Sequence, residues 1–586
     1  MQLESISHFP KSHMAYARDR ETIHIRLRAK KGDVTHVDLV YGDKYDWNRS
    51  YKRVEMNQFA SDQLYDYYQV EVKPPNLRLS YAFYLMSDFF SIYYTEKGLT
   101  HELAPHATGC FHYPFLNAAD VNQPPQWVKD AVFYQIFPER FANGDPSLNP
   151  ENVEHWDAKP KQDNFFGGDI QGVMNHIDYL HSLGITAIYF TPLFQATTNH
   201  KYDTIDYMQV DPQFGNNDTL KKLVRRCHER GIRVILDAVF NHSGYYFQPF
   251  QDVLTHQENS AYTDWFYLSE FPVKKDPSPN YGTFAFEYKM PKLNTEQPEL
   301  KAYLLDVARY WIEEVGIDGW RLDVANEVDH QFWREFRATV KSIKPDAYIL
   351  GEIWHNAHPW LQGDQFDAVM NYPVTDSILN FFCYRKTNAS TFMQEINHIQ
   401  AIYSEPVNEA AFNLLDSHDT ARLLTTCQED KRKMKAAATF QLTYQGTPCI
   451  FYGDEVGLTG GDDPDCRKTM IWDEEKQDQD LLSFYKKMIH LRNEHAALRD
   501  GSFRFLMTQS NDPVIAYERK NDSETFVVFI NAGDVSSYVL TSLEPGKYDE
   551  VFSNESYDAS GGSLHINVPA FSSLILQRIQ ESFRSP

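Results

Sequence analysis

The sequence predicts an α/β protein whose centre is a (β/α)8 barrel, with an antiparallel β-sandwich on either side of it. Residues 122–502 change about eight times from a short apolar segment to a helix-like segment, and such crossovers require a parallel sheet. Before and after this region, apolar and polar residues alternate over short runs, as in antiparallel strands. An open, doubly wound sheet is the alternative, but no G-x-G-x-x-G follows the first strand.

Residues 1–121 form the predicted N-terminal β-sandwich. With 586 residues, the chain exceeds what one hydrophobic core usually organises, so several domains are expected. The linker NQPPQW, at residues 122–127, carries two prolines and separates this domain from the barrel. The alternating runs of the N-terminal domain lie at residues 21–30, 36–42, 65–73 and 81–87.

The barrel is expected over residues 122–502, with an inserted loop domain at about 243–298 after the third strand. Its helix-like segments have apolar residues at helical spacing, and the first two end at a glycine. The predicted strands are residues 131–137, 185–192, 232–242, 317–324, 347–354, 366–373, 410–419 and 447–455. The clearest helices are residues 175–184, 219–231, 299–316, 330–344 and 481–501.

Residues 503–586 return to short alternating runs and predict a C-terminal β-sandwich. Its strands are expected at residues 514–520, 524–532, 537–542, 564–569 and 572–579.

Composition restricts the class of function. A net charge of −25 makes nucleic acid a poor partner, and an aromatic content of 15% suits either a sugar-binding surface or an aromatic core. The N-terminus has no apolar signal segment, and no run approaches the roughly 18 apolar residues of a membrane span. We therefore expect no membrane association and a cytoplasmic location. The cysteines contain no Cys-x-x-Cys pair, which argues against a zinc site or a disulfide framework.

Polar side chains gather where the predicted barrel strands end. Active sites of such barrels lie at the C-terminal ends of the strands. Burying several charges together is costly unless they serve a purpose, so this convergence predicts an active site. The residues at four strand ends are Asp237, Asn241 and His242; Arg321 and Asp323; Glu352; and Asp416, His418 and Asp419.

The pair Arg321 and Asp323 suggests which chemistry this site performs. Residues two apart on a strand point to the same face, so a cation and a carboxylate lie side by side. Glycoside hydrolysis uses two nearby carboxyl groups, one ionised and one protonated. Arg321 would lower the pKa of Asp323 and keep it ionised, whereas the apolar neighbours of Glu352 favour its protonated form. A purely structural ion pair would explain Arg321 and Asp323, but not the other strand ends.

Four segments resemble, in order, the signatures of the α-amylase family, glycoside hydrolase family 13. They are DAVFNH (237–242), GWRLDVANE (319–327), GEIW (351–354) and LLDSHD (414–419). MPKLN (290–294) and the tetrapeptide VANE are similar to the subgroup of cyclomaltodextrinases, neopullulanases and maltogenic amylases. The resemblance spans most of the chain and implies the same order of domains.

The resemblance implies a retaining mechanism. Asp323 would be the nucleophile, Glu352 the general acid and base, and Asp419 would stabilise the transition state. Further residues match the substrate contacts of the family or are candidates for the leaving-group side. These residues are Tyr202, His242, Arg321, His418, Asp463 and Arg467, and, on the leaving-group side, Asn326, Glu327, Trp354 and Phe286.

NGDPSLNP (143–150) and GGD (167–169) are similar to the calcium site of the subgroup. Hard oxygen ligands would come from Asn143, Asp145, Asn149, Gly167 and Asp169. The sequence departs from the family pattern at Leu148, which stands in place of an asparagine, and at Asn149, which stands in place of an aspartate. We therefore expect weak structural Ca²⁺ binding, with a turn that holds no metal as the alternative.

The resemblance to this subgroup also implies which substrates the protein cleaves and how its subunits assemble. Its N-terminal domain packs over the partner's active site in a homodimer, which favours cyclomaltodextrins and short linear maltodextrins, giving maltose and glucose. Transfer of the glycosyl unit to a sugar is a plausible side reaction. The alternatives are an enzyme that acts mainly on pullulan or starch and, more remotely, a non-catalytic carbohydrate-binding protein on the same scaffold.

Overall fold

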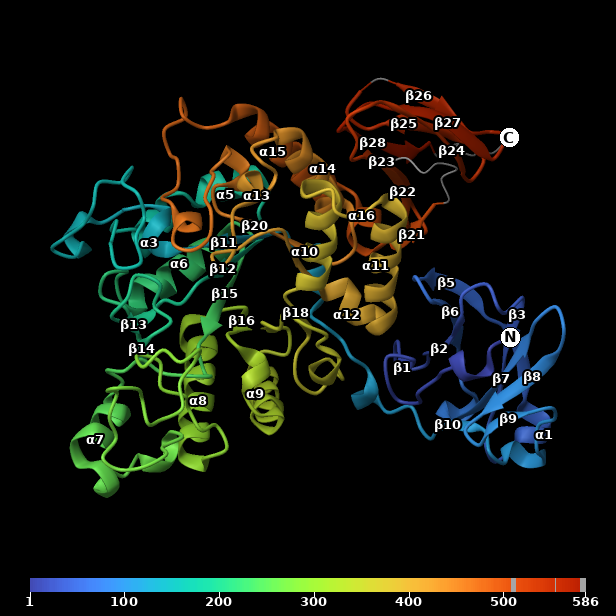
Figure 1. Cartoon of the computed structure of the whole chain (residues 1–586), viewed down its shortest axis with the longest axis horizontal. Coiled ribbons are helices and arrows are strands. Elements are labelled where there is room, and N and C mark those ends of the chain that lie inside the picture. Colours follow the sequence, from blue (N-terminus) through green and yellow to red (C-terminus); the bar gives the residue numbers. More distant parts are fainter. Residues whose placement is uncertain (507–512, 554, 580–586) are drawn as a thin grey trace. The chain divides into compact units, whose positions relative to one another are not determined.

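A computed structural model describes residues 1–506, 513–553 and 555–579 (Figure 1). By contacts the chain divides into two compact units. The first comprises residues 1–124, 358–363 and 387–409, and the second comprises residues 125–357, 364–386 and 410–586. Parts of the predicted C-terminal domain, at 507–512, 554 and 580–586, lie outside the described residues.

The first unit contains two antiparallel sheets. One has the order β1-β2-β6-β5, and the other has the order β4-β3-β7-β8-β9 with β10 beside β7. The inward residues of both sheets, such as Ile25, Leu39 and Phe83, share one apolar core. The strand bounds are β1 (Ala15–Ala17), β2 (Ile23–Lys30), β3 (His36–Gly42), β4 (Lys52–Glu55), β5 (Asn57–Ser61), β6 (Tyr65–Val72), β7 (Leu79–Met86), β8 (Ser91–Thr95), β9 (Gly98–Thr100) and β10 (Phe111–Tyr113). This unit also contains α11 (Ala389–Ile402) and all but the last residue of α12 (Glu405–Ala410).

The second unit contains the predicted barrel. Its parallel strands follow the order β18-β17-β16-β15-β12-β11-β20-β19, and a parallel bridge between Met370 and Phe412 closes the ring. The strands are buried on both faces, which explains their continuous apolar runs. They are β11 (Phe133–Ile136), β12 (Ala187–Phe190), β15 (Arg233–Ala238), β16 (Gly319–Leu322), β17 (Tyr348–Gly351), β18 (Ala368–Val369), β19 (Phe412–Leu414) and β20 (Thr447–Phe451).

The helices between these strands form where the sequence is amphipathic and a polar side chain caps the first turn. In α6 (Asn217–Glu229), Asn216 accepts a hydrogen bond from the Thr219 amide, and the buried residues Leu220, Leu223, Val224 and Cys227 form one face. The main helices are α5 (Ile177–Leu183), α6, α8 (Pro298–Tyr310), α9 (His330–Ile343), α10 (Tyr372–Ile378), α14 (Lys431–Thr443) and α15 (Gln479–Glu494).

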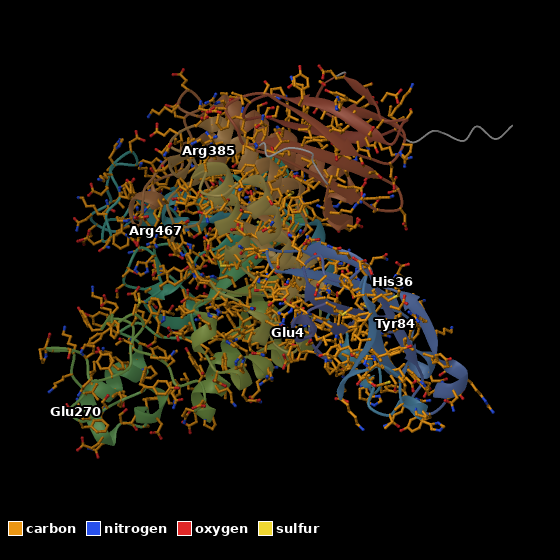
Figure 2. All side chains as sticks on the ribbon, turned by 45° about the vertical axis from the view of Figure 1, so that its right-hand side comes forward. Glu4, His36, Tyr84, Glu270, Arg385 and Arg467 are labelled. Carbon is orange, nitrogen blue, oxygen red and sulfur yellow. The ribbon has the colours of Figure 1, made fainter. Side chains whose placement is uncertain are left out.

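The segment after β15 has little regular structure. It contains α7 (Gln248–His256), and isolated bridges such as that between His242 and Lys292 join it to the strand end. Figure 2 shows Glu270, which is exposed, at the outer edge of this segment. Among the described residues no helix is both long and apolar enough to cross a bilayer.

The C-terminal strands form two antiparallel sheets. One has the order β21-β22-β23-β28-β25-β26, and β24 pairs with β27 in the other. Val527, Val539 and Ile566 belong to the core that both sheets share. The bounds are β21 (Ser502–Phe505), β22 (Val514–Lys520), β23 (Thr525–Asn531), β24 (Ser537–Ser542), β25 (Lys547–Glu550), β26 (Ser556–Asp558), β27 (Ser563–Val568) and β28 (Ser573–Arg578). The predicted fold class, a barrel flanked by two β domains, is therefore confirmed.

The close approach of β16 and β17 at Gly319 gives a test of the register of the barrel strands. A Cβ atom at Gly319 would lie 2.2 Å from the Tyr348 carbonyl oxygen on the neighbouring strand. Gly319→Ala should therefore lower the melting temperature by about 4 °C or more, because overpacking a buried position costs about 1–3 kcal/mol. Scanning calorimetry measures this. Gly561→Ala is the control, since its Cβ would meet open space, and an equal effect of both substitutions would contradict the barrel register.

Candidate active site

One guanidinium group links three carboxylates at the C-terminal ends of adjacent strands. Arg321 Nη1 lies 2.9 Å from Asp237 Oδ2 and 2.7 Å from Asp323 Oδ1, and Nη2 lies 2.9 Å from Glu352 Oε1. All four side chains are buried. Asp237 is the last residue but one of β15, and Arg321 belongs to β16. Asp323 and Glu352 follow β16 and β17 directly. Parallel pairing of these strands brings together residues that are far apart in the sequence.

The backbone after Asp323 is strained. Val324 has a φ of +44°, a left-handed conformation that β-branched residues rarely adopt. In this conformation its amide donates a hydrogen bond to Glu352 Oε2 at 2.9 Å. The turn therefore ties the segment of the predicted nucleophile to the predicted acid.

The sequence predicted that Arg321 lowers the pKa of Asp323. Burial instead raises the pKa of Asp323 well above its usual range, with Glu352 and Asp237 adding to the rise and Arg321 opposing it. Burial likewise raises the pKa of Asp237 to about 6, again against the pull of Arg321. This expectation about the net shift was wrong because burial of the Asp323 carboxyl outweighs the opposing effect of Arg321, and the neighbouring carboxylates add to the rise.

A second network surrounds His418, which follows β19. His418 Nε2 is 2.6 Å from the Tyr202 hydroxyl, and the two rings are stacked with an interplanar angle of 4°. The Tyr202 hydroxyl donates to Asp237 Oδ2 at 3.0 Å, which joins this network to the carboxylate cluster. Burial lowers the pKa of His418 well below its ordinary value and that of His242 to about 3. Both imidazoles are therefore neutral and can donate as well as accept hydrogen bonds.

Asp419 is held between a histidine and an arginine. Its Oδ2 lies 3.2 Å from His418 Nε2, and its Oδ1 lies 3.2 Å from Arg467 Nη2. Arg467 Nη1 is also 3.0 Å from Asp463 Oδ1. The two residues predicted from DDPDCRK therefore lie beside the predicted transition-state stabiliser.

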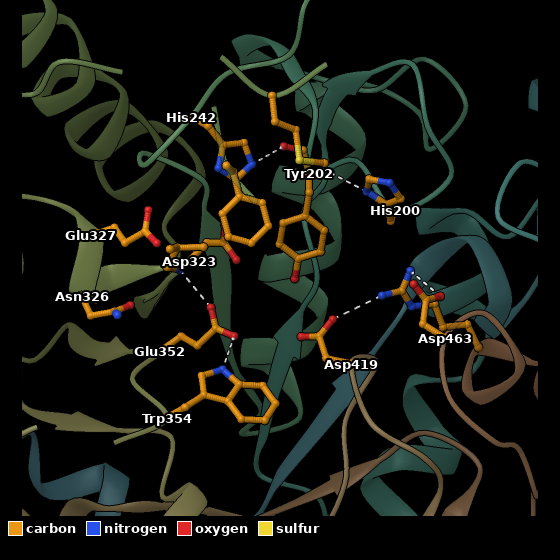
Figure 3. A pocket seen from close by; sticks show the side chains of 14 residues that line it. His200, Tyr202, His242, Asp323, Asn326, Glu327, Glu352, Trp354, Asp419 and Asp463 are labelled. Atoms are coloured by element: carbon orange, nitrogen blue, oxygen red, sulfur yellow. Dashed lines mark hydrogen bonds and ion pairs between the residues drawn. The ribbon is translucent and has the colours of Figure 1, made fainter. Parts of the chain in front are cut away.

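A cavity of about 540 Å³ opens over these groups (Figure 3). Ten of the predicted site residues line it: Tyr202, His242, Asp323, Asn326, Glu327, Glu352, Trp354, Asp419, Asp463 and Arg467. Arg321 and His418 are fully buried and act on the cavity through Asp323, Glu352 and Asp419. The prediction missed His200, Phe284, Met290 and Val324, which also line it.

Phe286 does not line this cavity. Its side chain is 95% exposed, and Phe284, two residues earlier, contributes to the wall instead and stacks on His242 at 5.1 Å between ring centroids. Residues 284–286 belong to no helix or strand, so the spacing of apolar residues in the sequence could not tell which phenylalanine faces the cavity. Trp354 is half-exposed and stacks on Tyr372 at 3.7 Å, and its indole N–H donates to Glu352 Oε1.

Lys292, in MPKLN, fixes the side of the cavity that Glu327 forms. Its ammonium donates to the Glu327 carbonyl oxygen at 3.0 Å, lies 3.5 Å from Glu327 Oε2, and contacts Asn241 Oδ1. Lys292 therefore joins the inserted segment, the end of β15 and the turn after Asp323. The motif was recognised in the sequence, but the role of its lysine was not, because the role depends on this long-range contact.

The two loops predicted to bind calcium lie together, but their residues are not equally suited to hold the ion. Asn143 Nδ2 donates to Asn149 Oδ1 at 2.9 Å, and Asn143 Oδ1 is buried without a partner. A Cβ atom at Gly167, whose φ is +81°, would lie 2.4 Å from Asn149 Oδ1, so the loops need glycine there. Asp169, by contrast, caps α4 (Ile170–Asn175) and accepts amide hydrogen bonds through both oxygens. Asp145 Oδ1 accepts from the Ser147 amide.

Models of protein families match three parts of the chain. Residues 135–501 match "Alpha amylase, catalytic domain", residues 1–117 match "Alpha amylase, N-terminal ig-like domain", and residues 507–579 match "Alpha amylase, C-terminal all-beta domain".

Individual proteins agree with this match. A cyclomaltodextrinase of Bacillus sp is 56% identical over 93% of this chain and 98% of its own length. A maltogenic alpha-amylase of Bacillus acidopullulyticus is 52% identical over 90% and 91% of the two chains. A solved structure titled cyclomaltodextrinase superposes with a TM-score of 0.96, at 51% identity, over 99% of this chain and 100% of the other.

The crowding of carboxylates around Arg321 predicts a cost in stability. A raised pKa in the folded protein means that stability falls as pH rises from about 4 through the folded pKa. Asp323→Asn removes one of these charges and should raise the melting temperature by about 1–3 °C at pH 8. The gain should shrink as pH falls below the folded pKa, where the wild type is protonated. Melting curves from pH 4 to 8 test this.

The exposed Glu258→Gln variant is the matched control and should show no such pH dependence. A lower melting temperature of Asp323→Asn at pH 8 would contradict the proposed repulsion.

Proposed function

Because the chain belongs to the alpha-amylase family, we propose that it hydrolyses α-1,4-glucosidic bonds of cyclomaltodextrins and short linear maltodextrins, giving maltose and glucose. The observation that carries this proposal is the guanidinium of Arg321 in contact with both Asp323 and Glu352 beneath an open cavity. Two carboxyl groups held this way suit the two roles that glycoside hydrolysis requires. The names of the relatives at 51–56% identity support the substrate class.

In the first step Asp323 attacks the anomeric carbon while Glu352 donates a proton to the departing glycosidic oxygen. Protonation of Glu352 removes a negative charge beside Asp323, and this favours the ionised nucleophile despite its raised pKa. In the second step Glu352 accepts a proton from water, and the water oxygen displaces Asp323 from the anomeric carbon. Retention of configuration follows from the two displacements.

The remaining residues would hold the sugar at the reacting bond. Asp419 accepts hydrogen bonds from sugar hydroxyls, and the neutral imidazole of His242 donates to them. The buried His418 acts through Asp419, which its imidazole contacts. The ring of Tyr202 offers a face for stacking, and its orientation is fixed by the hydrogen bonds of its hydroxyl. Asp463 and Arg467 contact the next glucosyl unit.

Asn326, Glu327 and Trp354 would contact the sugar that leaves. Trp354 rests one face on Tyr372, so the other is free for a glucosyl ring. The same group would bind a sugar acceptor, which allows transglycosylation when an acceptor replaces water.

Initial rates on β-cyclodextrin, pullulan and soluble starch at equal reducing-sugar potential test the function. We expect β-cyclodextrin to be cut fastest. Faster cleavage of pullulan or starch would favour the alternative activity of a neopullulanase or maltogenic amylase. Absence of cleavage of all three would support the non-catalytic carbohydrate-binding protein and overturn the proposal.

Glu352→Gln should lower kcat on these substrates by roughly 10²–10⁴-fold, the usual contribution of a general acid. The residual rate should be greater on an activated substrate such as p-nitrophenyl α-maltoside, whose leaving group needs no proton. Steady-state kinetics on both substrates measure the difference. Glu258→Gln should behave as wild type, and an equal loss for both leaving groups would remove Glu352 from the role of general acid.

A weak structural Ca²⁺ site is part of the proposal. The buried, unpartnered Asn143 Oδ1 is the observation that supports it, with Asn149, Asp145 and the Gly167 carbonyl as further oxygens. Asp169 contributes chiefly as a helix cap. The ion would hold the two loops together and takes no part in the reaction.

Asn149→Asp restores a charge next to Asn143, so Ca²⁺ at millimolar concentration should raise its melting temperature by several degrees and that of the wild type by less. Asn149→Ser adds no charge and serves as the control. Equal melting curves of all three proteins in Ca²⁺ and in chelator would contradict the site.

We further propose a homodimer formed through the N-terminal domain, in the cytoplasm. The large apolar side chains Phe9, Tyr45, Leu64 and Phe89 of that domain are exposed and would suit an interface. All six cysteines are free, as in reducing compartments. Sedimentation equilibrium tests the dimer, and a monomer at micromolar concentration would contradict it.

A further inference from the structure

Two buried cysteines are in direct contact in a part of the second unit that the proposed mechanism does not use. Cys383 and Cys427 are 44 positions apart in the sequence, and their Sγ atoms lie 2.9 Å apart. Cys383 is the last residue of η11 (Leu379–Cys383), a π-helical turn that continues α10, and Cys427 follows α13 (Leu423–Thr426). Neither cysteine lines the catalytic cavity.

This contact needs little movement to become a covalent bond. A disulfide has an S–S distance of about 2.0 Å, so the two sulfur atoms would have to approach each other by about 0.9 Å. Backbone hydrogen bonds hold each cysteine in place. The Cys427 amide donates to the Leu423 carbonyl oxygen at 2.9 Å. Beside Cys383, the Tyr384 amide donates to the Leu379 carbonyl oxygen at 2.8 Å. The fold therefore brings the two sulfur atoms together before any bond joins them.

The pair of cysteines lies directly beneath the protein surface. Each cysteine is the last buried residue before an exposed turn, residues 384–386 on one side and residues 428–429 on the other. Arg385, Gln428 and Glu429 have φ angles of +54°, +58° and +60°, which residues other than glycine rarely adopt. Exposed turns open at a lower free energy than buried strands and helices do. A small oxidant can therefore reach the sulfur atoms without unfolding of the barrel.

The two sulfur atoms differ from the other thiols in their surroundings. The hydrogen bond with Cys383 and burial raise the pKa of Cys427 well above its usual range, and Lys433 opposes the rise. Cys427 is therefore protonated at neutral pH, so the pair persists as two thiols until an oxidant reaches it. Cys466, by contrast, donates to the His418 carbonyl oxygen at 3.2 Å.

We propose that Cys383 and Cys427 are a modification site, at which hydrogen peroxide forms an internal disulfide in the folded protein. Peroxide oxidises one thiol to a sulfenic acid, and one water molecule leaves. The second sulfur then displaces the hydroxyl group of the sulfenic acid, which forms the S–S bond and releases a second water molecule. The two sulfur atoms together lose two electrons, which the peroxide oxygens gain, and the thiol protons leave in the water.

The new bond would close a long segment of the catalytic domain. Residues 383–427 include β19 and the loop that carries His418 and Asp419. Closing such a segment restricts the unfolded chain, so the melting temperature should rise by about 2–5 °C. A reductant would reverse the change. The inference does not depend on which substrate the protein cleaves.

Thiol counting and peptide mapping of the full chain test the inference. The folded protein is treated with hydrogen peroxide at pH 8, and the thiols that remain are alkylated in denaturant. We expect two of the six thiols to be lost. Mass spectrometry should find the peptide of Cys383 joined to that of Cys427, and dithiothreitol should separate them. The oxidised protein should melt about 2–5 °C above the reduced protein.

Cys383→Ala and Cys427→Ala should each abolish both the cross-link and the rise in melting temperature, and using both variants keeps the test valid if one fails to fold. Cys227→Ala removes a buried thiol of α6, keeps the pair, and should behave as wild type. Six intact thiols after peroxide treatment would overturn the inference. So would sulfinic acids at Cys383 or Cys427 without a cross-link, or a disulfide to another cysteine.

Discussion

The guanidinium of Arg321 is the group on which the site depends. Its two terminal nitrogens contact Asp237, Asp323 and Glu352, which come from three neighbouring strands. Burial raises the pKa values of Asp237 and Asp323, the neighbouring carboxylates add to the rise, and Arg321 opposes it. The same cation thus holds the two carboxyl groups that the proposed mechanism uses, Asp323 and Glu352.

The barrel makes this arrangement possible by its register. Parallel pairing places Asp237 beside Arg321, and Arg321 beside Leu350, so that Asp323 and Glu352 leave their strands at the same level. The left-handed turn at Val324 then directs an amide onto Glu352. The inserted segment adds Lys292, and the loops after β19 and β20 add Asp419 and Arg467. Rigid strands thus position the reacting groups, and loops shape the cavity that receives the glucan.

Much of this could be predicted from the sequence because the informative patterns are local. Polar residues at the strand ends indicated where the active site lies on the barrel. Motifs such as GWRLDVANE indicated the family of the chain. Long-range contacts set the remainder. The net pKa shift of Asp323 depends on Asp237 and Glu352, the role of Lys292 depends on its reach to Glu327, and Phe284 rather than Phe286 faces the cavity through an irregular loop.

The most direct test of the account is the anomeric configuration of the first product. Proton NMR during the first turnovers on maltohexaose distinguishes α- from β-anomers before they equilibrate. Two displacements at Asp323, assisted by Glu352, predict that the α-anomer appears first. Initial release of the β-anomer would mean a single displacement by water, and would contradict the role of Asp323 as a nucleophile held by Arg321.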